Sequence, residues 1–569
     1  MGVGAGLGAI AFRELVLGLT RVFTGHEDYG AQGLADHALL GIGPWFLLLA
    51  PVVGGLLYGP LLSRFAPEAR GHGVPEVMLA VARDGGRIRP RVALVKALAS
   101  GLCIGSGGSV GREGPIVQIG AALGSALGQM ARLPASRLRL LVACGAAGGI
   151  AATFNAPIAG VFFALEVILR DWAVGSFGTV VISAVAADAI SRAALGDAVV
   201  IAVPEFHVHS PWQYLLFACL GVVGMVVGLS FTRLLYGMED LADRIWRGPQ
   251  WARPAVGGLL LGALLLAMPQ LYGVGYGVLL KGVTGGYATT FLLALLAGKM
   301  VATSLTLAIG GSGGVFAPSL FMGAMVGTAY GDVVHGLVPG VAGAPGAYGV
   351  VGMAAVFAAA ARAPVTAVMI MIELTGGYGI VLPLMLGVVV AAGLAELITR
   401  DTIYTLKLRR RGIDIDQAAA PLTGVCVADA MAPAPSSVAA TAPLAAVLEV
   451  LTREDGDAVP VVDAGGRHMG VVSGLDAERT LAGGRTAPAG SLAADMPTLR
   501  EDDDLTVAIR GLAEAPWGLP VLSDGAVVGW VSHRDVVRAY GVALEGAAGR
   551  PRPAPGSEGG QAPRALDRS

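Results

Sequence analysis

Charge is scarce in this 569-residue chain, where Asp, Glu, Lys and Arg make up only 14% of the residues, against roughly 25% in average soluble domains. The hydrophobic share is 54% and the mean hydropathy is +0.68. The few cysteines form no Cys-x-x-Cys pair, so the sequence predicts neither a disulfide framework nor a metal site. A net charge of −2 gives no basic field for a nucleic-acid partner. We expect an integral membrane protein.

Long apolar segments follow one another to about Ile403. Several approach the ~20 residues that span a bilayer: residues 2–20, Trp45–Leu62, Gly175–Leu195, Trp212–Leu235, Ala255–Met268, Phe291–Ile309 and Ile380–Ile398. Residues 2–20 have no charged region before them and are expected to form a membrane helix rather than a signal peptide. Shorter segments, Gly114–Met130 and Pro157–Leu169, are typical of discontinuous helices around a site at membrane depth.

The sequence changes character after residue 405. We expect a membrane domain over 1–405, a linker over 406–424, and two soluble αβ units over 425–484 and 491–545. Each unit shows a strand, a tight turn, a second strand and then a Ser-x-x-Asp helix start, at Ser473–Asp476 and Ser532–Asp535. Residues 546–569 are rich in Pro, Gly and Ser and are expected to be disordered.

The membrane segment contains a repeat, with halves of about 1–200 and 210–405. Lys96 precedes Pro115 by the same nineteen residues that separate Lys299 from Pro318. The glycines between and after them match in pairs: 107–108 with 310–311, 111 with 314, 120 with 323 and 124 with 327. Ala156-Pro157 and Glu166 match Ala363-Pro364 and Glu373, and Gly71-His72-Gly73-Val74 resembles Gly275-Tyr276-Gly277-Val278. Duplicated halves with interrupted helices are typical of transporters with a midplane site.

Three glycine–proline motifs predict an anion site. Glycines permit tight turns, and a proline is tolerated in the first turn of a helix. A helix that begins inside the membrane leaves N–H groups and a positive dipole end that an anion can satisfy. We expect backbone amides to replace the hydration of an anion at Gly71–Pro75, Gly111–Pro115 and Gly314–Pro318.

Glu113 places an ionisable acid inside the second of these motifs. Its carboxylate can occupy such a site when ionised and leave it when protonated or displaced. The matching position of the other half is Phe316, so the chemistry of the two halves differs. A structural acid paired with Arg112 is the competing interpretation, although adjacent residues on a helix point in different directions.

These residues resemble the CLC family of chloride channels and chloride/proton antiporters. The resemblance rests on GHGVPEV (71–77), GREGP (111–115), FNAPIAG (154–160), GGVFAP (313–318) and IYTLKL (403–408). The soluble pair resembles tandem cystathionine-β-synthase (CBS) domains. The resemblance implies an all-α polytopic inverted-repeat domain with αβ CBS domains, a homodimer, and a multi-pass inner (cell) membrane location with cytoplasmic CBS domains.

By the same resemblance Glu113 is the gating and proton-transfer group, and chloride or another small anion is the transported partner. The anion-binding set is His72, Gly73, Val74, Val315, Phe316 and Tyr404. The selectivity motifs supply Gly71, Pro75, Gly111, Arg112, Gly114, Pro115, Gly314, Ala317 and Pro318. The CBS pair is expected to bind an adenine nucleotide through Ser473, Asp476, Ser532 and Asp535, although these residues can also be helix N-caps.

Two positions depart from the family pattern. His72 stands where many members have a serine whose hydroxyl binds the central anion, which leaves the order of anion preference open. Val167 stands where typical antiporters carry a glutamate on the inner proton route, as in many channels of the family. Glu166 is adjacent but points about 100° away on a helix. We therefore expect channel-like chloride flux, with proton-coupled antiport as the alternative.

Several residues also have structural interpretations. Glu76, Glu166 and Glu373 are expected to satisfy buried backbone or cationic groups, and Lys96 and Lys299 either hold loops or attract anions. An intramembrane hydrolase is a remote alternative because Gly107–Gly111 matches G-x-S-x-G, but a nucleophile elbow needs a preceding strand. A divalent-cation carrier needs clustered acids in its pore, and the motifs here are rich in glycine. No enzymatic activity is expected.

Overall fold

A computed structural model of the chain divides into two compact units, Met1–Ile413 and Asp414–Ser569. The structure describes residues 1–26, 29, 43–172, 174–196, 208, 210–414, 425–454, 456–503, 505–512, 515 and 517–547. Most of the expected linker and nearly all of the expected disordered tail lie outside the described residues. Unit 1 includes Lys407 and its neighbours, which the sequence analysis assigned to the linker, because they form a helix packed on this unit.

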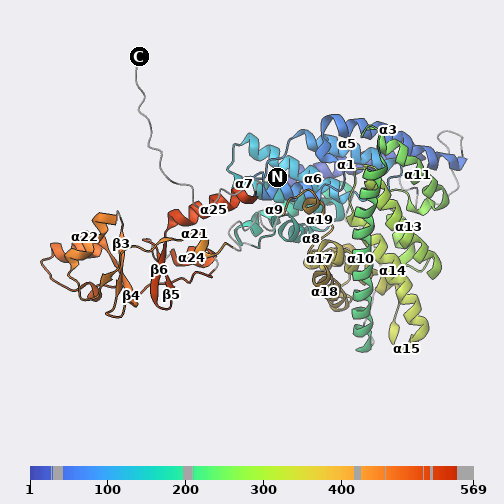
Figure 1. Cartoon of the computed structure of the whole chain (residues 1–569). Coiled ribbons are helices and arrows are strands. Elements are labelled where there is room, and N and C mark those ends of the chain that lie inside the picture. The colour runs from blue at the N-terminus through green and yellow to red at the C-terminus, as the bar shows by residue number, and fades with distance from the viewer. Residues whose placement is uncertain are drawn as a thin grey trace, which may run out of the picture. The chain divides into compact units, whose positions relative to one another are not determined.

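The described residues of unit 1 form helices joined by loops, with no β-strand among them (Figure 1). Seven of its helical segments are long and apolar enough to cross a membrane: Gly2–Thr24, Gly43–Phe65, Ala135–Phe154, Gly175–Leu195, Trp212–Ile245, Thr289–Ala308 and Val381–Ile398. In the same order these correspond to α1, η1 (Gly43–Trp45) with α3 (Phe46–Phe65), α7, α9 (Val174–Leu195), α10, α13 and α18. Six of the seven long apolar segments predicted from the sequence overlap these spans, while predicted Ala255–Met268 corresponds to a shorter helix over Arg253–Ala267 and the helix Ala135–Phe154 was not predicted. Helix α10 continues past the predicted end at Leu235 to Ile245. The prediction stopped early because the last turns of this helix are polar and carry no apolar signal.

The remaining helices of unit 1 are shorter or interrupted. They are α4 (Val74–Ala82), α5 (Arg91–Gly105), α6 (Glu113–Met130), α8 (Pro157–Phe163), α11 (Arg253–Ala267), α12 (Tyr276–Val283), α14 (Phe316–Leu337), α15 (Pro339–Ala342), α16 (Pro345–Ala361), α17 (Pro364–Thr375) and α19 (Thr405–Arg410). Single turns η2 (Pro67–Ala69) and η4 (Pro269–Leu271) precede α4 and α12, and a π-helical turn, η3 (Ala164–Leu169), extends α8.

Matched glycines let matched helices approach closely in both halves. A Cβ on Gly120 of α6 would collide with the carbonyl of Gly145 on α7, and a Cβ on Gly323 of α14 would collide with the carbonyl of Gly352 on α16. Helix backbones in contact through small residues are typical of membrane bundles. The repeat seen in the sequence is thus a repeat of helix packing, and it places the starts of α6 and α14 at equivalent points.

The second unit contains two small sheets. Sheet order β2-β3-β4 joins β2 (Val438–Ala439), β3 (Ala458–Val462) and β4 (His468–Ser473), with β2 parallel and β4 antiparallel to β3. Sheet order β1-β6-β5 joins β1 (Ala432–Pro433), β5 (Leu519–Ser523) and β6 (Ala526–Val531), all antiparallel. Helices α21 (Val427–Ala430), α22 (Leu444–Glu454), α23 (Gly474–Ala482), α24 (Leu505–Leu512) and α25 (His533–Ala547), with the turn η5 (Ala489–Ser491), complete the unit.

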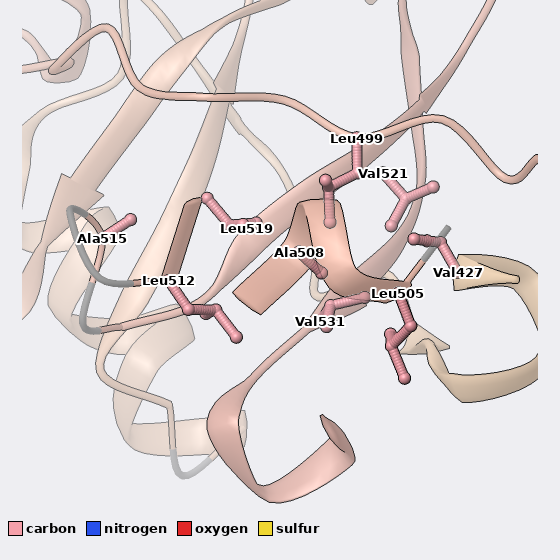
Figure 2. Close-up of a cluster of buried hydrophobic side chains, with 9 residues drawn as sticks. All are labelled: Val427, Leu499, Leu505, Ala508, Leu512, Ala515, Leu519, Val521 and Val531. Atoms are coloured by element: carbon pink, nitrogen blue, oxygen red, sulfur yellow. The ribbon is translucent and has the colours of Figure 1, made fainter. Parts of the chain in front are cut away.

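The start of the first αβ repeat belongs to the core of the second. Val427 of α21 is buried with Leu505, Leu519 and Val531 in one apolar cluster (Figure 2), and Ala432 of β1 pairs with a residue of β6. The first predicted unit therefore gives its opening segment to the core and the sheet of the second. The predicted strand–turn–strand–helix order is confirmed in both, as β3-β4-α23 and β5-β6-α25.

Candidate functional site

The three glycine motifs meet and are joined by backbone hydrogen bonds. Gly111 and Gly314 exchange N–H···O=C bonds of 2.8 and 2.6 Å. Gly71 donates to the Gly311 carbonyl at 3.1 Å and accepts from the Gly313 N–H at 3.3 Å. The junction brings together the N-termini of α4, α6 and α14, as the sequence predicts. Each of these ends leaves N–H groups without an acceptor inside its own helix.

The carboxylate of Glu113 lies at this junction, with the residue only 1% exposed. Its Oε2 accepts from the Ala317 N–H at the start of α14, at 3.4 Å, and its Oε1 accepts from the Tyr276 hydroxyl at 2.7 Å. The carboxylate thus accepts a backbone N–H at a helix N-terminus, where free N–H groups favour negative charge. The guanidinium of Arg112 lies over the Tyr276 ring, 5.4 Å from its centroid.

Tyr276 is a site residue that the sequence reasoning did not select. It begins α12 and occupies the position that matches His72 in the other half. The signal was present in the match between Gly71-His72-Gly73 and Gly275-Tyr276-Gly277. Each half therefore contributes an aromatic side chain with a polar atom to the surroundings of Glu113.

Most of the predicted anion-binding residues line one narrow cavity. Its lining is His72, Val74, Glu113, Gly114, Val117, Ile150, Phe163, Val315, Phe316 and Tyr404. Of the predicted anion-binding set only Gly73 is outside this lining; its φ of 81° forms the turn into α4. We call this space the Glu113 cavity. Gly114 must be glycine here, because a Cβ would collide with the His72 carbonyl oxygen and lie 3.0 Å from Cα of Gly314.

His72 and Tyr404 are both fully or almost fully buried, and their ring centroids are 6.1 Å apart. Nε2 of His72 is 3.3 Å from the hydroxyl of Tyr236, which donates to the Ile403 carbonyl at 2.5 Å. Nδ1 of His72 has no hydrogen-bond partner among the described residues. His72 therefore lines the cavity with its ring close to Tyr404 and Tyr236, and whether its side chain takes part in anion binding stays a prediction.

A second cavity, of about 490 Å³, lies next to Tyr236. Its lining is strongly polar and includes Arg70, Tyr236, Glu239, Asp243, Arg253, Lys407, Arg410 and Arg411. We call it the basic cavity. Tyr236 is the residue that both lines this cavity and bonds to His72 of the first one.

Lys96 and Lys299 hold matching loops. Lys96 of α5 donates to the carbonyls of Ala69 and Gly71, at 2.9 and 2.7 Å, just before α4. Lys299 of α13 donates to the carbonyls of Gly273 and Val274, at 2.9 and 3.1 Å, just before α12. The structural interpretation of these lysines is supported, because each one fixes a loop that leads to a helix at the site.

Glu166 of the first half caps a helix of the second half, and Glu373 of the second half caps a helix of the first. Glu166 accepts from the N–H groups of Val365 and Thr366 and from the Thr366 hydroxyl, at the start of α17. Glu373 accepts from the N–H groups of Ile158 and Ala159 at the start of α8, at 2.9 and 2.7 Å. Glu76 is paired with Arg411 at 2.7 Å. All of these carboxylates satisfy backbone or cationic groups, as expected.

Val167 is buried at 5% exposure within η3, and the Glu166 carboxylate next to it is directed to the start of α17. The Glu166 carboxylate is therefore engaged at the start of α17, and no acid stands at position 167 itself. Ser109 of the G-x-S-x-G pattern is preceded by helix α5 and donates to the Leu271 carbonyl at 2.7 Å. Among the described residues this is not the strand–turn–helix elbow that a hydrolase needs.

In the second unit the Ser-x-x-Asp pairs cap helices. Ser473 accepts from the Asp476 N–H at 3.1 Å and donates to its carboxylate at 2.7 Å, at the start of α23. Ser532 and Asp535 make the same exchange before α25, where the Ser532 N–H also donates to the carboxylate. The capping interpretation is thus present in the structure, and a nucleotide role remains a prediction.

Two family models match the chain. One, described as voltage gated chloride channel, matches residues 54–396, and one described as CBS domain matches residues 427–482 and 490–542. The chain is 37% identical over 421 residues to a putative chloride channel protein ClcB-like of Ralstonia nicotianae, covering 73% of this chain and 96% of the relative. It is 37% identical over 360 residues to the H(+)/Cl(-) exchange transporter ClcA of Vibrio parahaemolyticus, covering 62% and 76%.

Solved structures share the fold. A slow cyanobacterial Cl⁻/H⁺ antiporter aligns with a TM-score of 0.65 and 27% identity, over 72% of this chain and 96% of that one. A eukaryotic CLC transporter aligns with a TM-score of 0.63 and 23% identity, over 94% of this chain and 96% of that one. The second likeness concerns the fold alone.

Proposed function

The chain belongs to the CLC family of voltage gated chloride channels and transporters and carries a tandem CBS pair, and on that premise we propose that it exchanges chloride for protons through a pathway gated by Glu113. It is an integral membrane protein that transports anions. The observation that carries the proposal is the buried Glu113 carboxylate, which accepts the Ala317 N–H at the junction of three helix N-termini.

A carboxylate in this position competes with the transported anion for the same backbone donors. When Glu113 is ionised, it holds the Ala317 N–H and blocks the cavity. When it takes up a proton, it no longer carries the charge that this dipole end favours, and an anion replaces it. Binding of a proton and binding of an anion are linked in this way, which is the requirement for exchange.

Two findings set exchange ahead of the channel-like reading that the sequence analysis placed first. Relatives that share 37% identity over 360 residues are named exchange transporters, and the structural neighbour at 27% identity is an antiporter. Val167 stands where typical antiporters carry an inner glutamate, but the proposed gate, Glu113, is present. An exchanger with this sequence needs an inner proton route that does not use position 167.

The anion set is proposed to consist of backbone amides at Gly73, Val74, Val315 and Phe316, with the side chains of His72 and Tyr404 on the inner side. His72 and Tyr404 line the same cavity as Glu113. His72→Ser and Tyr404→Ala are expected to change the order of anion preference. The check is flux in liposomes with chloride, nitrate or fluoride, and an unchanged order in His72→Ser would limit His72 to its backbone.

The soluble unit is proposed to face the cytoplasm and to bind an adenine nucleotide. Basic residues near membrane segments favour the cytoplasmic side, and Lys407, Arg409, Arg410 and Arg411 end unit 1. An inner-membrane location and a homodimer with one pathway per subunit complete the proposal. Calorimetry on the purified full chain with AMP, ADP and ATP tests the nucleotide, and no heat with any of them would leave Ser473, Asp476, Ser532 and Asp535 as helix caps.

Reconstitution into chloride-loaded liposomes tests the exchange itself. With an outward chloride gradient and the membrane potential held at zero, an exchanger drives protons inward against their own gradient. We expect sustained uphill proton movement at a fixed ratio to chloride. Chloride efflux without uphill proton movement would refute the exchanger and support the channel-like reading.

A further inference from the structure

His72 and Tyr236 connect the two cavities of unit 1. His72 lines the Glu113 cavity, Tyr236 lines the basic cavity, and their side chains are 3.3 Å apart. Both residues are buried, with His72 fully excluded from solvent. No other pair of titratable side chains with a hydrogen bond between them joins these two cavities among the described residues.

The hydrogen-bond pattern assigns the protons of this pair. The Tyr236 hydroxyl donates its hydrogen to the Ile403 carbonyl at 2.5 Å, so its oxygen accepts from Nε2–H of His72. A neutral imidazole with a proton on Nε2 has a free lone pair on Nδ1. That nitrogen is buried and has no partner among the described residues, although leaving a buried acceptor unsatisfied is ordinarily destabilising.

We propose that His72 and Tyr236 form the inner proton route of the exchanger, carrying protons between Glu113 and the basic cavity. The proposal rests on the proposed exchange. It gives a proton route that needs no carboxylate at position 167. A proton released by the Glu113 carboxylic acid crosses the narrow Glu113 cavity and binds Nδ1 of His72. The Nε2 proton passes to the Tyr236 oxygen, and the tyrosine hydroxyl turns away from the Ile403 carbonyl and releases its own proton to water in the basic cavity.

The sequence of transfers balances, because one proton enters at Nδ1 and one leaves from the tyrosine hydroxyl. The imidazole ends with its proton on Nδ1, and the starting tautomer returns when Nδ1 releases that proton and Nε2 takes one up. In the basic cavity the acceptor water lies near the carboxylates of Glu239 and Asp243, which line the same space as Tyr236. Transfer from the basic cavity to Glu113 follows the same steps in reverse.

The charges around His72 favour a relay through neutral imidazole. The cations that face it are Lys96 on α5 and Lys407 and Arg411 at the end of unit 1, while Tyr236, Tyr404 and Glu113 complete its titratable surroundings. Cations so close oppose a resident imidazolium. His72 therefore passes a proton on instead of storing it, and a bound anion in the Glu113 cavity would ease the transfer by offsetting this charge.

The test measures the ratio of proton to chloride flux in liposomes for the full chain and its variants. Tyr236→Phe keeps the ring and removes the hydroxyl, and His72→Gln keeps a polar side chain that cannot carry a proton. We expect the ratio to fall at least tenfold in each. Tyr348→Phe is the matched control, since it removes a buried tyrosine hydroxyl that also donates to a backbone carbonyl at 2.5 Å, that of Ala342.

The possible outcomes distinguish a failure of the proposed proton route from a failure of the proposed chloride/proton exchange. If wild type and Tyr348→Phe drive protons uphill and both relay variants do not, the route is supported. If either relay variant keeps the wild-type ratio, the route is wrong while the exchange stands. If the wild-type protein moves no protons, the exchange fails and the route fails with it. The ratio of proton to chloride flux does not depend on the turnover rate, so a slower variant can still be compared with the wild type. Two relay variants are used so that misfolding of one leaves the other to test the route.

Discussion

The reciprocal capping of α8 and α17 predicts a graded loss of stability. Glu166 accepts three hydrogen bonds at the start of α17, from the Val365 and Thr366 N–H groups at 3.1 and 2.9 Å and from the Thr366 hydroxyl at 2.6 Å. Glu373 accepts two at the start of α8. Replacing either carboxylate by an amide turns an acceptor oxygen into an NH₂ group, which faces at least one of these donors.

The expected cost follows from the donors left unpaired. A part-buried donor without an acceptor costs about 1–3 kcal/mol, and a carboxylate at a helix N-terminus contributes about 0.3–1 kcal/mol. We expect Glu166→Gln to lower the free energy of unfolding by about 2–3 kcal/mol. Glu373→Gln should lose about 1–2 kcal/mol, because one of its two hydrogen bonds is exposed to solvent.

The assay is denaturant unfolding of the purified protein in detergent, followed by tryptophan fluorescence. Glu396→Gln is the control, because Glu396 is exposed on α18 and such surface substitutions usually stay within about 0.5 kcal/mol. If both capping variants match this control, or if Glu373→Gln is the more damaging, the capping account is wrong.

Three further predictions concern the loops and the soluble unit. In Gly114→Ala the added Cβ collides with the His72 carbonyl oxygen, so we expect about 1–3 kcal/mol lost and little anion flux, while Gly237→Ala, with nothing within 4 Å, should retain both. In Lys96→Met two loop carbonyls lose their donor, at about 1–3 kcal/mol each, and exposed Lys281→Met is the control for the same unfolding measurement. Burial lowers the pKa of His468, so the unfolded state binds more protons; stability of the second unit should be full above the ordinary histidine pKa and fall as pH drops through the folded value, and thermal unfolding from pH 8 to 5 should show no such fall in His468→Gln.

Residues that act through local pattern were predicted well. Glycine–proline spacing located the starts of α4, α6 and α14, because a helix inside apolar sequence needs those residue types where it begins. The repeat also identified Glu166 with Glu373 and Lys96 with Lys299 as matched pairs. Their positions in the chain carried this information without any knowledge of the tertiary structure.

Contacts between segments far apart in the sequence could not be predicted from these local patterns. The spacing of Glu166 within its own half does not reveal that its carboxylate caps α17 of the other half. In the same way, nothing near Ala432 indicates that β1 pairs with β6, which lies in the second αβ unit of the sequence. Tyr276 reaches Glu113 only because the two halves interlock. Such pairings depend on how the halves pack, which a single sequence leaves open.

Substitution of Glu113 tests the central claim most directly. Glu113→Gln keeps the size of the side chain and mimics the protonated acid, so the account predicts that chloride continues to flow in liposomes while uphill proton movement and the pH dependence of flux disappear. Proton and chloride fluxes recorded together on the wild type and this variant decide the matter. Uphill proton movement that survives in Glu113→Gln would contradict the assignment of Glu113 as the gate and proton carrier.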